Sequence, residues 1–340
     1  MFPASQTPAI RLSPARPAQA AIASPGRKQD QAAETYHTGR CRSIKGPQRR
    51  RQPFHGRRWR LTILPWRPEN TPVWQEQFIE KIRNVFEPNE RVIALFLAGS
   101  FGKGQADAYT DVDLLAIVAR DDQAEFSAGW RHQLETIAPV VFWNELGKEE
   151  RVFNAITDQW QRVDLAVADA ESLKKRSRDA LKPLIDRQGL YDALPATVPW
   201  TGPNKGYVAY LINEFFRVFG LLAVASGRRE YLLSMAGVEL LRMMLFNLLS
   251  EEVERSDKGG MLAWSRRLSP EQLGLLASIP PLEPTPQSLI DAHLACAKAF
   301  LPRARKMAER WNIEWPQAFE EATWNNLERE VGLIKPDGLS

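Results

Sequence analysis

The stretch that decides the fold is residues 92–118, which read VIALFLAGSFGKGQADAYTDVDLLAIV. It opens with a short apolar run that is partly β-branched, and this predicts a buried strand over residues 92–98. Three glycines, Gly99, Gly102 and Gly104, follow at once and predict a turn. A second apolar run predicts another strand over residues 112–118. The order strand, glycine turn, strand is the starting point for the rest of the chain.

Two carboxylates stand at the start of the second predicted strand, at Asp111 and Asp113. Side chains alternate between the faces of a strand, so these two lie on one face while Val112 points to the other. Carboxylates that close repel each other unless a cation lies between them, and hard oxygen ligands beside phosphate suit magnesium. The pattern predicts a phosphate-holding turn followed by a metal-binding strand, which is the chemistry of nucleotide transfer.

A third acid, Asp164, lies within an apolar run that predicts a strand over residues 161–167, paired as a hairpin with residues 151–156. An unpaired carboxylate in such a strand costs several kcal/mol. If this strand lies beside the first acidic strand, Asp164 completes a three-carboxylate site for two Mg²⁺ ions. An ion pair with Arg162, or an edge position, is the alternative that the sequence leaves open.

These motifs together resemble the nucleotidyltransferase domain of the DNA polymerase β-like superfamily, whose pattern is Gly-Ser, a glycine-containing turn, Asp-x-Asp and a later strand Asp. The resemblance covers residues 91–168. It implies that the Gly-Ser turn holds a nucleoside triphosphate, that the Asp-x-Asp pair binds metal and that the later Asp helps to deprotonate the acceptor. These roles fall on Gly99 and Ser100, on Asp111 and Asp113, and on Asp164.

Two further turn residues, Lys103 and Gly104, are assigned to nucleotide binding. A basic residue at position 103 stands where it could meet phosphate, and a solvated loop lysine is the alternative.

The second half of the chain changes to helical patterns, with two strongly apolar helices expected over residues 205–226 and 229–250. Residues 213–216, NEFF, and 239–244, ELLRMM, resemble the C-terminal domain of the aminoglycoside 6-adenylyltransferase (streptomycin adenylyltransferase-like) family. Phe216 replaces the tryptophan that is usual there. The resemblance implies transfer of AMP from ATP to a hydroxyl of a small, polar, aminoglycoside-like acceptor, a reaction of the antibiotic-resistance type.

Glu214 lies in a nearly all-apolar helix and has two interpretations. It pairs with Arg217, three residues on, or it faces the acceptor, where the resemblance implies a catalytic role toward an amine or hydroxyl. Glu239 and Arg242 repeat the spacing and the same two interpretations. The sequence leaves the role of Glu239 open.

The predicted fold class is α+β, a nucleotidyltransferase domain with a mixed sheet and helices followed by an α-helical bundle. The predicted domains are a disordered basic tail over residues 1–62, the nucleotidyltransferase domain over 63–193 and the acceptor-binding helical domain over 194–335.

Residues 1–60 contain 13 Arg or Lys and two acids, a net charge of about +11. Since the whole chain is +4, the remainder is about −7. The tail is either an unstructured leader, including an over-extended start, or a nucleic-acid-binding arm.

Composition excludes several classes for the body of the chain. With 44% apolar and 25% charged residues, it is an ordinary globular protein. Cys41 and Cys296 are isolated, which argues against a disulfide framework or zinc site and fits the cytoplasm. We expect no membrane span and no nucleic acid as a partner of the body, whose mild acidity fits a cationic acceptor.

The alternative function is a nucleotidyltransferase fold that modifies a partner protein or binds nucleotide without turnover. The oligomeric state is not indicated.

Overall fold

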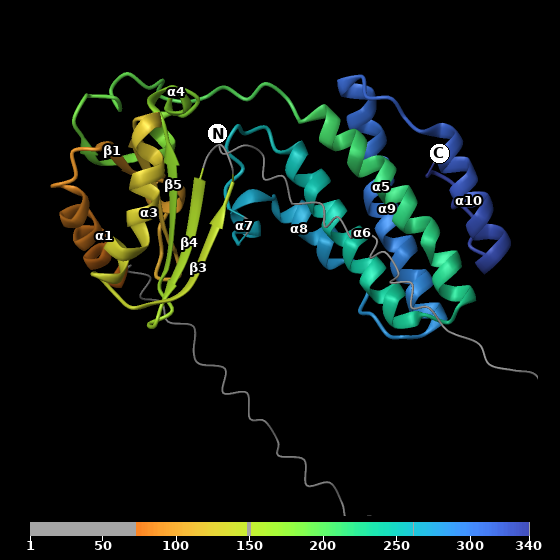
Figure 1. Ribbon diagram of the computed structural model, residues 1–340. Coiled ribbons are helices and arrows are strands. Elements are labelled where there is room, and N and C mark those ends of the chain that lie inside the picture. Colours follow the sequence, from red (N-terminus) through yellow and green to blue (C-terminus); the bar gives the residue numbers. More distant parts are fainter. Residues whose placement is uncertain (1–72, 148–150, 261, 340) are drawn as a thin grey trace, which may run out of the picture. The chain divides into compact units, whose positions relative to one another are not determined.

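The computed structural model describes residues 73–147, 151–260 and 262–339 (Figure 1). The predicted basic tail over residues 1–62 lies outside the described residues. The chain divides into two units, and all described residues fall within the same one.

A six-stranded sheet forms the first half of the described chain. Its strands are β1 (Val92–Leu97), β2 (Val112–Val118), β3 (Val140–Leu146), β4 (Arg151–Thr157), β5 (Arg162–Ala168) and β6 (Lys182–Asp186). Their order across the sheet is β3-β4-β5-β2-β1-β6. The β2–β5 pair is parallel and the other four pairs are antiparallel. The sheet is therefore mixed, as the sequence predicts.

The two faces of the sheet are covered differently. One face, called here the back face, packs against α1 (Val73–Phe86) and α3 (Gln123–Glu135). Phe86 of α1 stacks on Trp130 of α3 with ring centroids 5.2 Å apart. The opposite face, called here the front face, carries a smaller apolar cluster under β1, β2 and β5 that includes Phe96 and Leu173. That front face also carries the three acidic side chains, because β2 and β5 present alternate residues to it.

Short elements depart from the sequence-based expectations. The glycine stretch forms a four-residue helix, α2 (Gly99–Gly102), rather than a simple turn. The expectation that the second half of the chain is helical is wrong at β6, an edge strand that contains Pro183 and therefore has a weak strand signal. Three further short turns of helix are η1 (Arg120–Asp122), α4 (Ala170–Leu173) and η2 (Arg178–Ala180).

The second half of the described chain is helical. Its helices are α5 (Lys205–Gly227), α6 (Tyr231–Glu252), α7 (Trp264–Arg267), α8 (Pro270–Ala277), α9 (Pro286–Trp311) and α10 (Gln317–Val331). Asn204 begins α5, because its side chain accepts a hydrogen bond from the Tyr207 backbone N–H. At the centre of the core, Phe215 of α5 stacks on Phe300 of α9 with centroids 4.1 Å apart. These helices share one large apolar core, so the predicted fold class, α+β with a helical second half, is confirmed.

By length and composition alone, α5 and α6 are apolar enough to cross a membrane. About half of each apolar window is buried within the structure, 56% in α5 and 44% in α6. Core helices of soluble proteins pass the same test, so this is weak evidence for a membrane span.

Candidate active site

Three carboxylates meet on the front face of the sheet. Asp113 on β2 stands directly opposite Asp164 on the parallel neighbour β5, and Asp111 lies just before β2. One carboxylate oxygen from each lies within 4.8 Å of the other two. In the residues that the structure describes, this is the one such group of three or more possible metal ligands. The strand pairing that the sequence left conditional is therefore present.

The electrostatics of this cluster favour a cation. Burial, and then the charges of Asp111 and Asp164, raise the pKa of Asp113 to about 7. Burial raises the pKa of Asp164 as well, against the lowering effect of a hydrogen bond from the Asn154 side chain. Carboxylates in this state gain most from a bound divalent ion, which lowers their mutual repulsion.

Arg162 supplies part of the compensating charge. One of its guanidinium nitrogens lies 3.2 Å from Oδ2 of Asp111, and another donates a hydrogen bond of 3.2 Å to the Tyr109 carbonyl. The ion pair is thus made with Asp111, not with Asp164 as the alternative reading of the sequence supposed. Asp164 keeps its place in the cluster.

The glycine turn packs directly on the acidic strand. The backbone N–H of Ala98 donates to the Asp113 carbonyl at 2.9 Å, and Gly99 follows with φ of +53°. A Cβ atom on Gly99 would lie 1.8 Å from Oδ2 of Asp113, which is far inside contact distance. Only glycine fits this position, for both conformation and space. Ser100 is the second residue of the short helix α2, and Gly104 ends the turn with φ of +66° in open space.

Lys103 is held in place instead of being a solvated loop residue. Its ammonium lies 2.6 Å from Oδ2 of Asp257, and its side chain is 20% exposed. Nearby, Arg266 of α7 binds both Oδ2 of Asp107 at 2.8 Å and the Gln105 carbonyl at 2.7 Å. Two ionic contacts therefore tie the turn to the segment between α6 and α8. The Lys103 charge also lowers the pKa of Asp113, against the larger raising effect of burial.

Glu214 is not a member of the carboxylate cluster. Arg217 binds both of its carboxylate oxygens, at 2.7 and 2.5 Å, so the ion pair that the sequence offered as one interpretation is present. Glu239 and Arg242 form a looser pair of the same spacing, at 3.8 Å.

Sequence reasoning missed two residues near the cluster. The side chain of Asn154, on the adjacent strand β4, hydrogen-bonds to Asp164. The alternation of side chains along the predicted hairpin is the sequence signal that places Asn154 on the same face of the sheet as Asp164. Asp257 lies in a loop far along the chain from Lys103, and nothing local in the sequence pairs the two.

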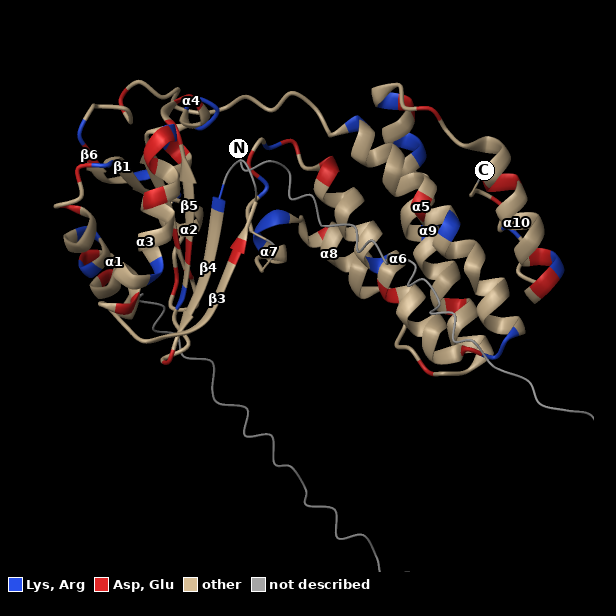
Figure 2. Ribbon diagram, viewed as in Figure 1, with Lys and Arg blue, Asp and Glu red and all other residues tan. Residues whose placement is uncertain are grey.

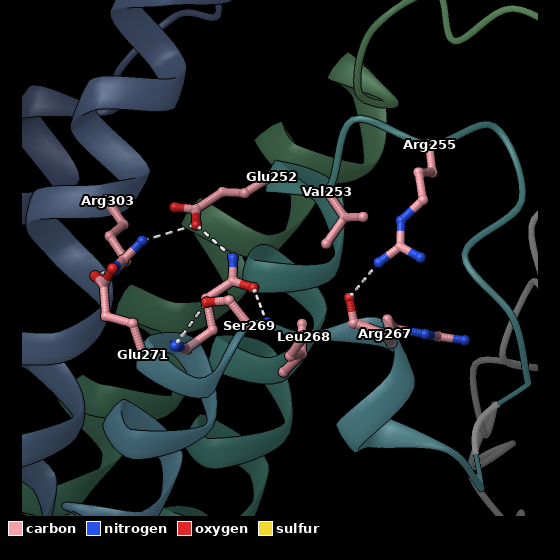
Figure 3. A pocket seen from close by; sticks show the side chains of 9 residues that line it. Glu252, Val253, Arg255, Arg267, Leu268, Ser269, Glu271 and Arg303 are labelled. Atoms are coloured by element: carbon pink, nitrogen blue, oxygen red, sulfur yellow. Dashed lines mark hydrogen bonds and ion pairs between the residues drawn. The ribbon is translucent and has the colours of Figure 1, made fainter.

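A separate cavity of about 370 Å³ lies at the end of α6 in the helical half (Figure 3). Its charged side chains largely satisfy one another, since Arg303 binds both Glu252 and Glu271 and Arg255 donates to the Arg267 carbonyl. It is therefore assigned no chemistry.

We expect Asp113→Asn to stabilise the metal-free protein at pH 8. A carboxyl whose pKa rises from 3.8 to about 7 on folding contributes stability at low pH, and this contribution is lost as the pH rises through 7. Removing the charge should raise the unfolding free energy at pH 8 by about 2 kcal/mol, or roughly 5 °C in Tm, and change little at pH 4. Thermal melts in EDTA at both pH values measure this. A lower Tm for the variant than for the wild type at pH 8 would show that the charge of Asp113 does not destabilise the folded protein.

Comparisons with known proteins found one matching family model and several solved structures of low similarity. The family model described as streptomycin adenylyltransferase matches residues 74–329. An aminoglycoside 6-adenyltransferase from Bacillus subtilis matches with 16% identity and a TM-score of 0.34, over 74% of this chain and 97% of that one. The CCA-adding enzyme of Thermotoga maritima, solved with tRNA, matches with 15% identity and a TM-score of 0.29, over 80% and 69% of the two chains.

TM-scores this low support no statement about function, and the search of curated proteins found no match. The family model, however, spans most of the chain, including the glycine turn, the acidic strands and the central helices. The resemblance seen in the sequence is confirmed. The chain belongs to the streptomycin adenylyltransferase family and is an adenylyltransferase.

Proposed function

We propose that the protein transfers AMP from ATP to a hydroxyl of a small, polar, aminoglycoside-like acceptor, in a magnesium-dependent reaction. The observation that carries this proposal is the cluster of Asp111, Asp113 and Asp164 packed against the Gly99 turn. Three carboxylates within 4.8 Å offer hard oxygen ligands to two Mg²⁺ ions, and the turn beside them is the place for phosphate.

The reaction follows from these positions. The acceptor hydroxyl oxygen forms a bond to the α-phosphorus of ATP while the bond from that phosphorus to the bridging oxygen breaks, so that pyrophosphate leaves. Asp164 takes the hydroxyl proton, and the hydrogen bond from the Asn154 side chain holds its carboxylate in place for this role. Asp111, Asp113 and Asp164 would hold magnesium, which would supply charge neutralisation and a lower pKa for the attacking hydroxyl.

The nucleotide side of the site is assigned to Gly99, Ser100, Lys103 and Gly104. Gly99 lets the backbone approach Asp113 without a clash, so phosphate and metal ligands share one small region. Lys103 offers a positive charge at the same turn, which is why we assign it to the triphosphate.

The acceptor assignment rests on family membership and on charge. Streptomycin adenylyltransferases are named for a cationic acceptor, and residues 61–340 of this chain carry a net charge of about −7. Figure 2 shows acidic residues distributed over both the sheet and the helices. ATP is an intracellular metabolite, and we therefore also propose the cytoplasm as the place of action.

The test is incubation of the full chain with ATP, MgCl₂ and a panel that contains streptomycin and other aminoglycosides, with pyrophosphate release and product mass as readouts. We expect pyrophosphate release that depends on one panel member and on magnesium, with one AMP added to that compound. Release that is independent of every acceptor, or transfer that is insensitive to EDTA, would contradict the proposal.

We propose Glu214 as an acceptor residue and expect Glu214→Gln to raise the acceptor KM or lower kcat by roughly 100-fold in total, while ATP binding persists. Its partner Arg217 has a side chain that is 54% exposed, and Glu214 itself is 21% exposed. An acceptor amine can therefore approach the Glu214 carboxylate from solvent and exchange for the guanidinium.

The control for this substitution is Glu135→Gln, which removes a charge from the ion pair with Arg131 on α3, a helix that packs on the back face of the sheet. Steady-state kinetics and a thermal melt on the same preparations separate the two roles of Glu214. A Glu214→Gln variant that is destabilised yet fully active would assign Glu214 to structure alone.

A further inference from the structure

The carboxylate row continues across the sheet as a row of amides. The registers place Asp113 opposite Asp164, Asp164 opposite Asn154, and Asn154 opposite Asn144, from β2 through β5 and β4 to β3. Residues directly opposite in neighbouring strands point to the same face. All four side chains therefore lie on the front face, in one line that ends at the sheet edge formed by β3.

The glycine turn fixes which end of this line belongs to the nucleotide. Gly99 follows β1 and packs on Asp113, so the phosphate-binding region lies on the β1 side of β2. Attack at phosphorus is in line with the departing pyrophosphate, so the acceptor oxygen approaches from the side opposite to the leaving group. Along this row of side chains, β4 and β3 lie on the far side of β2 from the turn, so the acceptor approaches over these two strands.

That part of the front face is open and has the chemistry of a sugar-binding surface. Next to Asn144 in β3, on the same face, Phe142 is 48% exposed and Leu146 is 51% exposed. Their partners in β4, Ile156 and Val152, flank Asn154 in the same way. The two amide side chains, Asn144 and Asn154, therefore have an apolar pair on either side of them along the strands. Strands lie about 4.8 Å apart, so Asn144 stands about 10 Å from Asp164, room for one ring and its substituents.

We propose that the front face of β3 and β4 binds the acceptor ring that carries the reacting hydroxyl, with Asn144 and Asn154 as its hydrogen-bonding specificity residues. This inference rests on the proposed function. Amides both donate and accept, which matches hydroxyl groups, and they carry no charge to attract an ammonium. The ring recognised here is therefore a polyhydroxylated one, and the cationic substituents of the acceptor bind elsewhere.

Asn154 has a second role, as a positioning residue. Its side chain hydrogen-bonds to Asp164, which fixes the carboxylate that takes the acceptor proton. Asn144, one strand further on, makes no such contact with the three carboxylates and acts on the acceptor alone. The two residues therefore predict different kinetic effects.

The test is steady-state kinetics of AMP transfer to streptomycin, or to the panel member that the wild type uses best. We expect Asn144→Ala to raise the acceptor KM about tenfold, the scale of one lost hydrogen bond, with kcat and the ATP KM within about twofold. Asn154→Ala should raise the acceptor KM and also lower kcat about tenfold. Glu145→Gln is the matched control, since it changes the next residue of β3 on the back face, and it should leave all three constants unchanged.

Three results would count against the inference in different ways. An unchanged acceptor KM in Asn144→Ala, in a variant with wild-type Tm, overturns it. A raised ATP KM with an unchanged acceptor KM also overturns it and would show that this face binds the nucleoside instead. A wild type that transfers AMP to no panel member refutes the proposed function, and the inference falls with it. Asn144→Ser, which keeps a small polar side chain, serves as the second variant if the alanine variant folds poorly.

Discussion

Replacing Asp111 or Asp113 with asparagine is expected to lower AMP transfer by at least about 1,000-fold, or roughly 4 kcal/mol of activation free energy. Each change removes one anionic ligand from a cluster whose oxygens lie within 4.8 Å of one another. The stabilisation of transition-state charge by metal is lost with it. The measurement is pyrophosphate release at saturating ATP and magnesium.

The matched control for these variants is Asp158→Asn in the exposed turn between β4 and β5, which removes an equal charge away from the cluster. It should retain wild-type turnover. Both cluster variants should remain folded, since they relieve repulsion instead of creating a cavity. Turnover within tenfold of wild type in either cluster variant would remove that residue from the metal site.

The second large effect is expected for Gly99→Ala, a change of one methyl group. Its Cβ would stand 1.8 Å from Oδ2 of Asp113, and its φ of +53° is strained for alanine. Either the turn or the Asp113 carboxylate must move, so we expect transfer to fall by about 100-fold or more, since small displacements of reacting groups have effects of that size.

Gly189→Ala, outside the site, separates backbone strain from the clash. Gly189 also has a positive φ, of +67°, but a Cβ there meets nothing within 4 Å. It should lose about 1 kcal/mol of stability and retain most of its turnover. Circular dichroism melts and pyrophosphate release on both variants measure the two effects. Equal loss of turnover in the two variants would mean that the contact with Asp113 is not what matters.

Local patterns predicted the elements that hold the site. The strands on either side of the glycine turn and the strand around Asp164 are short, nearly continuous apolar runs, and this predicts their positions. The faces on which their acids lie follow from the two-residue period of a strand. That Asp164 lies beside Asp113 depends on topology, because β3 and β4 intervene in the chain while β5 pairs with β2. Sequence alone could state this only as a condition.

Three other features were absent from the predictions, two of them for physical reasons. The ion pair of Lys103 with Asp257 joins residues that are far apart in the chain, and no spacing rule reaches across that distance. β6 is short, lies at an edge and contains proline, so its hydrophobic pattern is weak. α8, by contrast, has a local start signal in the sequence, because Ser269 and Gln272 form a capping box around Pro270.

The central claim is that Asp111, Asp113 and Asp164 form one divalent-metal site. It is tested most directly by titrating Mn²⁺ into the full chain, followed by electron paramagnetic resonance, in the presence of a non-hydrolysable ATP analogue. The wild type should bind Mn²⁺ in competition with Mg²⁺, and each single asparagine variant should lose at least one ion or bind it at least about tenfold more weakly. Identical Mn²⁺ binding by the wild type and all three variants would contradict the account.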